Sequence, residues 1–230
     1  MQEDAQDNGD DAGRLLDAML AHVPFEGWSA ASLDAAAADL GLGRGEVAAL
    51  APGGAIGMAA AYHRRLDEGM RARLASADLS ALRFRDRVAL ALRFWLDGAD
   101  REAVRRGSTL FALPQHSAQA ARLVWGTVDA IWTALGDNSA DVNWYTKRLT
   151  LAGVFPAVVL YWLGDRSGGG VDTREFIDRR IEGVMRIESA KATVRKLPGM
   201  TQFLAGPFTP LNRVKAPKGR RGNTPGRWTR

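Results

Sequence analysis

Apolar residues recur at helical spacing along most of this 230-residue chain, and this pattern limits the possible folds more than any other feature of the sequence. Leu15, Leu16, Met19 and Val23, for example, fall on one side of a helix. The alternation of apolar and polar residues that a half-buried strand requires persists nowhere in the chain. Because β-branched residues are also scattered among alanine, leucine and arginine, the sequence predicts an all-α fold.

With 46% apolar residues, the chain can form one large core, or a small domain fused to a larger one. We predict an acidic, disordered leader over 1–10 and a three-helix unit with a connecting helix over 11–75. A ligand-binding helical domain is predicted over 76–196. Residues 197–230 are predicted to form a short amphipathic segment followed by a basic, disordered tail.

Three short helices are predicted in the first unit. The first ends before Pro24, Ser29 or Ser32 caps the second, and Gly41 provides the turn to the third. Two short helices joined by such a turn form a helix-turn-helix. A flexible, glycine-rich loop is predicted over 167–170. Longer helices are predicted over 62–74, 79–95, 101–113, 115–135, 140–164 and 173–196.

The most apolar stretch, Leu149–Leu163, has only 15 residues and contains Pro156. A helix needs roughly 20 apolar residues to span a bilayer. We therefore expect a buried helix here. Asp172 or Thr173 is predicted to cap the helix that follows.

Charge is distributed unevenly along the chain. Over 11–68, eight acidic residues oppose four basic ones, whereas over 186–230 eleven basic residues oppose a single acidic one. The net charge of +5 is therefore a property of the C-terminal end, and such an end suits an anionic surface of phospholipid or nucleic acid. The first eleven residues are acidic, unlike a signal or transit peptide, so a cytoplasmic protein is expected.

The sequence offers little for catalysis. The absence of cysteine excludes disulfides, thiolate nucleophiles and cysteine-bound zinc. His22, His63 and His116 fall on separate predicted helices, and none of the spacings HExxH, GxSxG, GxGxxG or GxxxxGK[ST] occurs. Asp137, Asp141 and Asp165 can be imagined as a metal cluster, but helix capping is the simpler role for Asp137. We expect neither an enzyme nor a metal site.

The stretch LLDAMLAHVPFEGWSAASLDAAAADLGLGRGEV, at 15–47, resembles the opening three-helix unit of TetR-type regulators. This resemblance implies a TetR-like helical bundle, with an N-terminal helix-turn-helix-like unit and a C-terminal ligand-binding domain. The recognition helix departs from that family, because Val47, Ala48, Ala49 and Leu50 occupy positions usually given to Tyr, His and Lys. Arg44 is the cation nearest to them.

The stretch DVNWYTKR at 141–148 is similar to the signature of the Coq-nine family of ubiquinone-biosynthesis accessory proteins. RDRVALALRFWL at 85–96 and the Trp125/Trp132 helix support the resemblance, which extends over about 11–196. It implies a lipid held in a TetR-like fold and a C-terminal amphipathic helix that touches the membrane. It also implies that the Asn-Trp-Tyr surface docks the di-iron demethoxyubiquinone hydroxylase.

The Trp-Tyr pair has a physical meaning of its own. Adjacent residues on a helix point about 100° apart, so at least one of the two rings lies at the margin of the core or on the surface. Exposed aromatic rings beside polar residues are typical of binding hot spots, although ordinary helix packing is the alternative. The candidate partner-binding residues are Asp141, Asn143, Trp144, Tyr145 and Arg148.

The helix predicted over 115–135 is apolar around most of its circumference, so it either packs into a core or lines a cavity. Periodicity cannot distinguish these two cases, but the family resemblance favours a lipid cavity with apolar walls. The candidate lipid-binding residues are Trp95, Leu110, Phe111, Trp125, Val128, Ile131, Trp132 and Phe155.

Apolar residues near the C-terminus precede a run of cations, a combination that suits an anionic membrane interface. Pro207 and Pro210 would interrupt an amphipathic helix there, and an unstructured tail is the alternative. The candidate membrane-binding residues are Leu197, Met200, Phe203, Leu204, Phe208 and Leu211.

These observations lead to one functional hypothesis, a non-catalytic accessory protein of ubiquinone biosynthesis. It binds an isoprenoid quinone intermediate or a phospholipid, with no other cofactor, and presents the quinone to the hydroxylase. We expect a homodimer with no specific nucleic acid partner, cytoplasmic and peripheral on the inner face of a bacterial membrane. The alternatives are a TetR-type ligand-responsive transcriptional regulator, which needs a basic reading head, and a fatty-acid-binding regulator.

Overall fold

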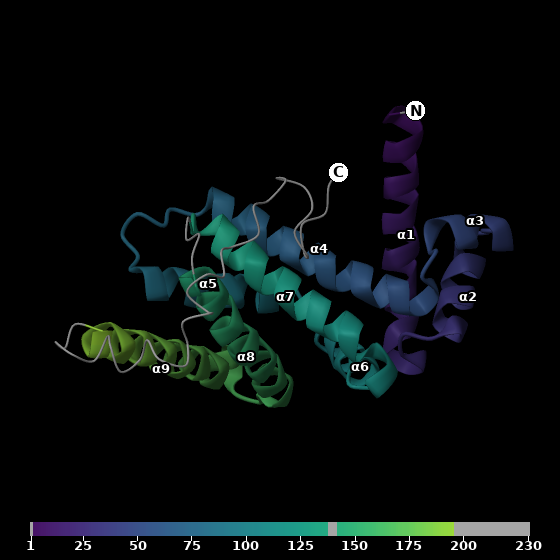
Figure 1. The fold of residues 1–230 in the computed structure, drawn as a ribbon. Coiled ribbons are helices and arrows are strands. Elements are labelled where there is room, and N and C mark those ends of the chain that lie inside the picture. Colours follow the sequence, from purple (N-terminus) through teal and green to yellow (C-terminus); the bar gives the residue numbers. More distant parts are fainter. Residues whose placement is uncertain (1, 138–141, 196–230) are drawn as a thin grey trace. The chain divides into compact units, whose positions relative to one another are not determined.

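In the computed structural model, the backbone is described for residues 2–137 and 142–195 (Figure 1). Side chains are described for 10–137, 145 and 147–183. Every regular element in this part of the chain is helical, which confirms the predicted all-α fold. The helices are α1 (Gln2–Glu26), α2 (Ala30–Asp39), α3 (Arg44–Leu50), α4 (Gly54–Ser76), α5 (Phe84–Asp97), α6 (Arg101–Phe111), α7 (Ser117–Ala134), α8 (Val142–Gly164) and α9 (Val171–Arg195), with short 3₁₀ turns η1 (Pro114–His116) and η2 (Gly168–Gly170).

The described residues form two compact units. The first comprises those up to Glu68 together with Gly98–Leu123, and the second comprises Gly69–Asp97 together with those from Val124 onward. This division differs from the predicted one at 75/76, because residues 98–123, which contain α6, belong to the first unit. No helix in the described part combines the length and the apolarity needed to cross a membrane.

In the first unit, α1 packs against α2, α3 and α6. Ser29 caps α2 through a reciprocal pair of hydrogen bonds with Ser32, so the predicted cap is confirmed. Gly41 takes a φ of +67° at the predicted turn, a conformation that favours glycine. The buried Trp28 donates a hydrogen bond from Nε1 to the Ala103 carbonyl oxygen at 3.0 Å, and this bond ties the helix-turn-helix to α6.

Helix α1 is longer than predicted at both ends. Residues 2–10, predicted as a disordered leader, lie within it, and so does Pro24. Proline lacks the N–H that an interior helical position would donate, but Pro24 stands in the last turn, so only Phe25 and Glu26 follow it in the helix. Gly27 donates to the Val23 carbonyl at 2.8 Å, and Arg106 Nη2 donates to the Pro24 carbonyl at 2.7 Å. These two bonds satisfy carbonyl groups that the end of the helix would otherwise leave without partners.

In the second unit, α9 packs against α5 and α8. Helix α5 begins at Phe84 rather than near Leu79, because the Asp78 carboxylate accepts a hydrogen bond from the Ser80 backbone N–H at 2.9 Å. Such a local side-chain bond competes with helix formation. Within the core of this unit, the Trp95 and Phe155 rings meet edge to face, with centroids 5.0 Å apart.

The loop predicted over 167–170 is ordered by one carboxylate. Asp165 accepts hydrogen bonds from the backbone N–H groups of Ser167 at 2.7 Å and Thr173 at 2.9 Å, and from both hydroxyl groups. These bonds hold the pKa of Asp165 well below its usual range. Asp165 therefore satisfies the Thr173 N–H in the first turn of α9, whereas Asp172 or Thr173 is the predicted cap of this helix.

Candidate functional site: the start of α8 and its buried ion pairs

The motif that resembles a known signature lies at the beginning of α8. Tyr145 is half-buried there. Asn143 and Trp144 belong to the helix, but their side chains lie outside the described part, as does the whole of Asp141. The structure therefore places residues 142–148 of the motif on a helix, while the contacts of Asp141, Asn143 and Trp144 stay predictions.

Arg148, at the end of the motif, is buried between two carboxylates. Its Nε donates to Asp129 Oδ1 at 2.8 Å, and its Nη1 donates to Asp137 Oδ2 at 3.0 Å. The side chains of Arg148 and Asp137 are only 3% and 4% exposed, respectively. Asp129 belongs to α7 and Asp137 follows that helix, so the Arg148 guanidinium fastens the first turns of α8 to the end of α7. Buried ion pairs of this kind hold a local geometry firmly, because a charge left without its partner is costly.

Lys147 extends this network toward the surface. Its Nζ donates to Asp137 Oδ1 at 2.9 Å and lies 5.4 Å from the centre of the Trp132 ring. The Trp132 ring also stacks against the ring of Phe84, with a centroid distance of 5.3 Å. The indole Nε1 of Trp132 is buried and has no hydrogen-bond acceptor among the residues that the structure describes. Elements far apart in the sequence thus converge around the start of α8.

This geometry corrects the predicted role of Arg148. Arg148 is a predicted partner-binding residue, but its side chain is buried and paired inside the chain. It acts on the motif by positioning the helix. The signal for this role is present in the sequence, because Asp129 is a carboxylate within the apolar face of α7 and a buried carboxylate requires a partner. Asp137 likewise forms ion pairs instead of acting only as a helix cap.

Most of the predicted lipid-binding residues lie in the second unit. Five of them are almost completely buried, namely Trp95, Val128, Ile131, Trp132 and Phe155. Trp125 is half-buried. Direct ring contacts such as that between Trp95 and Phe155 show that part of this wall is packed core.

The remaining candidates fall elsewhere. Leu110 and Phe111 are half-buried residues of the first unit, so they do not share a unit with the other lipid-binding candidates. The predicted membrane-binding residues, all between 197 and 211, lie outside the described residues. A pocket of about 370 Å³ occurs in the second unit, but charged residues of α5 and α9 form most of its lining, and none of the candidate lipid-binding residues contributes to it.

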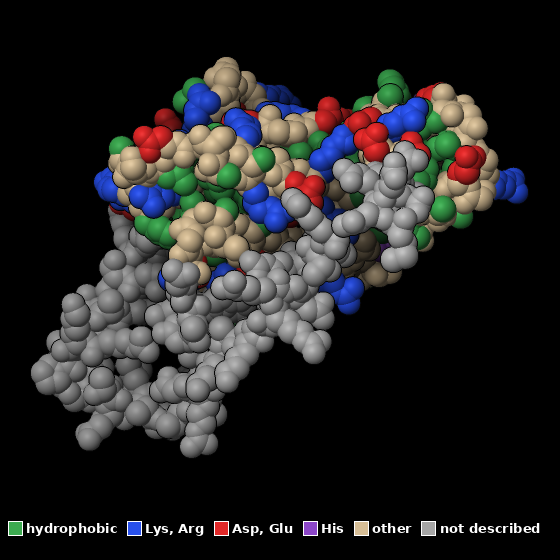
Figure 2. Space-filling view, turned by 90° about the horizontal axis from the view of Figure 1, so that it is seen from above, with side chains coloured by type: hydrophobic (Ala, Val, Ile, Leu, Met, Phe, Trp, Pro, Cys, Tyr) green, Lys and Arg blue, Asp and Glu red, His purple; other side chains and the backbone are tan. Residues whose placement is uncertain are grey.

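The helix that would read DNA in a regulator is α3, and it has an unusual surface for that task. None of its residues is buried, and Glu46 uses its carboxylate to accept a hydrogen bond from Gly43 N at 2.7 Å. Ala48 and Ala49 are exposed beside it. On the face shown in Figure 2, basic and acidic side chains are interspersed rather than gathered into a basic stripe. Phosphate binding by a reading head requires several cations, and α3 supplies only Arg44.

Comparison with known proteins identifies relatives of this chain. Residues 117–188, which include α7 and α8, match the family model COQ9. The ubiquinone biosynthesis protein COQ9 of Rattus norvegicus is 27% identical over 224 residues, which cover 93% of this chain and 71% of the rat protein. The Drosophila melanogaster COQ9 protein is 28% identical over 195 residues, covering 81% of this chain and 60% of that protein. The resemblance predicted from the DVNWYTKR stretch is thereby confirmed.

A solved structure shows a similar fold. The TetR transcriptional regulator from Nitrosomonas europaea matches 76% of this chain and 98% of its own, with a TM-score of 0.64 and 20% sequence identity. The predicted TetR-like architecture is confirmed. At this identity the match concerns the fold alone.

The relatives correct the predicted location. The sequence analysis expects a cytoplasmic protein, peripheral on the inner face of a bacterial membrane. The proteins of rat, fly and human that this chain resembles are all described as mitochondrial. The prediction of a bacterial membrane is therefore wrong by this comparison. The acidic start of the chain, from which it was argued, carries no information about the address of the protein.

Proposed function

We propose that this chain, a relative of the COQ9 proteins, serves ubiquinone biosynthesis as a non-catalytic accessory protein. In this proposal it binds a polyprenyl quinone intermediate and presents it to the di-iron hydroxylase that acts on demethoxyubiquinone. The chain spans 71% of the rat relative and 66% of the human one, so the activities of those whole proteins enter here as part of the proposal.

One observation carries the proposal. The residues that match the COQ9 family model include the start of α8, which Arg148 holds in place. The match at 117–188 contains the apolar α7 and α8 and the motif at the start of α8. Because Arg148 is held by two buried carboxylates, that start has a defined direction relative to α7. A docking surface benefits from such rigidity, since less conformational entropy is lost when the partner binds.

Presentation requires no bond making by this chain. Each CH₂ group removed from water contributes about 0.8 kcal/mol, so a polyprenyl tail of a few isoprene units strongly prefers an apolar environment. A protein that shelters part of the tail can expose the quinone ring to an enzyme. The apolar residues of α7 and α8 are suited to such shelter, and the aromatic motif is suited to contact with the enzyme.

The test is a binding measurement between this chain and the hydroxylase. We expect that Trp144→Ala combined with Tyr145→Ala weakens the complex by about 2 kcal/mol or more, as the loss of hot-spot aromatic residues does. Leu160→Ala is the matched control, because Leu160 is an apolar residue of the same helix, 64% exposed and outside the motif. It should leave the affinity nearly unchanged.

The fold of each variant is checked by circular dichroism and by the midpoint of urea unfolding. A folded double variant with unchanged affinity would contradict the docking role of the motif. Unfolding of the double variant would show instead that the two rings belong to the core.

A further inference from the structure

A second site lies away from the motif. We infer that the pocket between α5 and α9 binds the phosphate group of a phosphate ester, held by the guanidinium groups of Arg83, Arg85 and Arg93. Its volume of about 370 Å³ falls within the range of about 300–1,000 Å³ that is typical of small-molecule sites. The lining consists of Arg83, Arg85, Asp86, Ala89, Arg93, Asp178, Ile181 and Glu182.

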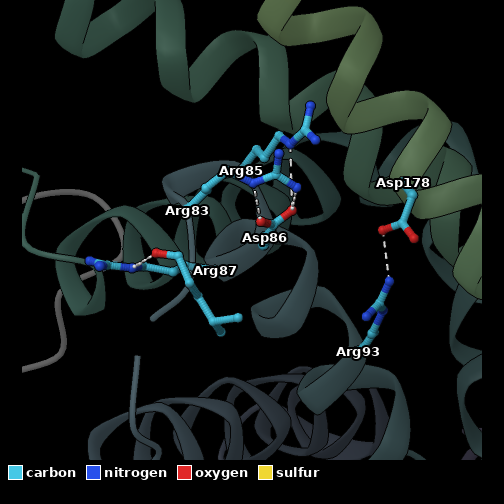
Figure 3. Close-up of polar contacts among 7 residues, drawn as sticks. Arg83, Arg85, Asp86, Arg87, Arg93 and Asp178 are labelled. Atoms are coloured by element: carbon cyan, nitrogen blue, oxygen red, sulfur yellow. Dashed lines mark hydrogen bonds and ion pairs between the residues drawn. The ribbon is translucent and has the colours of Figure 1, made fainter. Parts of the chain in front are cut away.

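The cations of the pocket come from α5 and the residue before it. Figure 3 shows Arg83 and Arg85 converging on Asp86, with the two Nε atoms 2.8 Å and 3.5 Å from its carboxylate oxygens. Arg93, further along α5, reaches toward α9, where its Nη2 donates to Asp178 Oδ1 at 2.7 Å. The neighbouring arginines hold the pKa of Asp86 below its usual range, so this carboxylate stays ionised and keeps both side chains in place.

Formal charges balance in the lining, since three arginines face three carboxylates, but hydrogen-bonding capacity does not. Each guanidinium carries about five N–H donors, and the two oxygen atoms of a carboxylate offer about four lone-pair sites, so the donors of three arginines outnumber the acceptor sites of three carboxylates. Asp86 already accepts from Arg83 through both of its oxygens. The Nε of Arg93 is buried and has no acceptor within the described part of the chain, and an unsatisfied buried donor is costly. Among these side chains, donors are thus in excess of acceptor sites, and a ligand that carries acceptor oxygens could use the donors that remain.

A phosphate group fits this requirement better than other small anions. It offers several oxygen atoms in a geometry that planar guanidinium groups bind through paired hydrogen bonds, whereas chloride offers no such directions. Ala89 and Ile181 provide apolar contacts for whatever group is esterified to the phosphate. Arg87 takes no part, since its Nε donates to the Leu82 carbonyl at 2.9 Å and its side chain is directed away from the cluster (Figure 3).

Two sources can provide such a group, a phospholipid headgroup or a soluble phosphate. The inference does not depend on the proposed function, because none of the lining residues belongs to the motif or to the candidate lipid-binding residues.

The experiment is isothermal titration calorimetry of the full chain at 0.15 M NaCl, where surface charges are largely screened. The probes are inorganic phosphate, dihexanoyl phosphatidylglycerol below its micelle concentration, and dihexanoylglycerol, which has no phosphate. We expect saturable binding of at least one phosphate-bearing probe, and Arg85→Gln should weaken it at least tenfold. Arg93→Gln should do the same if it stays folded by circular dichroism. Arg166→Gln is the matched control, because Arg166 is an exposed arginine of the same unit outside the pocket, and it should change the affinity by less than twofold.

The pattern of binding separates the two sources. Binding of inorganic phosphate assigns the site to a soluble phosphate, whereas binding of the phosphatidylglycerol alone assigns it to a lipid headgroup. The inference is overturned if neither phosphate-bearing probe binds, or if dihexanoylglycerol binds as well as the phospholipid. Equal losses in Arg85→Gln and Arg166→Gln would overturn it too, because they would show general charge attraction.

Discussion

A single side chain, Arg148, holds the start of α8 against the end of α7. Its guanidinium forms ion pairs with Asp129 and Asp137, two carboxylates that have little access to water. Arg148→Met should lower the free energy of unfolding by about 3–5 kcal/mol, because both carboxylates lose a buried partner. Lys147→Met is the control. The Lys147 side chain is 32% exposed, and Asp137 keeps Arg148 as a partner, so the loss of the ammonium group should cost about 1 kcal/mol or less. Urea unfolding at pH 7 measures both values, and equal losses would contradict the structural role of Arg148.

His63 makes the stability of the first unit depend on pH. Burial lowers its pKa to about 4, and the neighbouring Arg64 cation contributes in the same direction. In the unfolded chain His63 binds a proton below its ordinary pKa of about 6.5. In the folded protein it takes up this proton only near pH 4. The stability due to the neutral imidazole is therefore complete above about pH 6.5 and is lost as the pH falls toward 4.

The variant that tests this is His63→Gln. Between pH 6.5 and pH 4, its free energy of unfolding should fall less steeply than that of the wild type, by at most about 1.4 kcal/mol per pH unit. Unfolding curves from pH 7 to pH 4 measure it, with His116→Gln as the control histidine. A slope that is the same in the wild type and in His63→Gln would disprove the assignment.

Among the elements, the turn before α9 depends most on one residue. Asp165 accepts hydrogen bonds from Ser167 and from Thr173, and its lowered pKa means that these bonds stabilise the ionised form. Asp165→Asn should lower the melting temperature at pH 7 by about 2–4 °C, the range expected when a helix of a protein this size loses a cap. Asp172→Asn serves as control, since Asp172 is an exposed carboxylate in the first turn of α9.

The pH dependence of this effect has a definite sign. The contribution of Asp165 is present above the ordinary pKa of about 3.9 and is lost as the pH falls below it. The difference in melting temperature between the wild type and Asp165→Asn should therefore shrink on acidification below about pH 4. A difference that is independent of pH would indicate a purely steric effect of the substitution.

The sequence predicts the helices well and their ends less well, for a physical reason. Apolar periodicity is a local signal, so each long helix falls near its predicted position. Helix ends depend on side chains elsewhere, as in the bond from Arg106 to the Pro24 carbonyl, 82 residues away. The same limit applies to the site. The motif is visible in the sequence, but the pairing of Arg148 with Asp129 and Asp137 is a property of the packed chain.

For the whole molecule, the sequence predicts the fold class but not the division into units. Residues 98–123 belong with the first unit because of contacts such as that between Trp28 and Ala103, which are 75 residues apart. No local pattern marks this pairing. Periodicity also leaves the apolar interior ambiguous, since an apolar face is the same whether it packs against a neighbouring helix or lines a cavity. The central claim, that this protein carries a quinone lipid, therefore needs a direct chemical test.

That test is native mass spectrometry of the purified full-length chain, followed by solvent extraction and identification of any bound lipid. The account predicts that an isoprenoid quinone or its precursor co-purifies, or that the protein acquires one when incubated with a polyprenyl quinone. Denatured protein, treated in the same way, should retain none. A folded protein that is free of lipid and stays so after incubation, or that holds phospholipid and never acquires a quinone, would contradict the account.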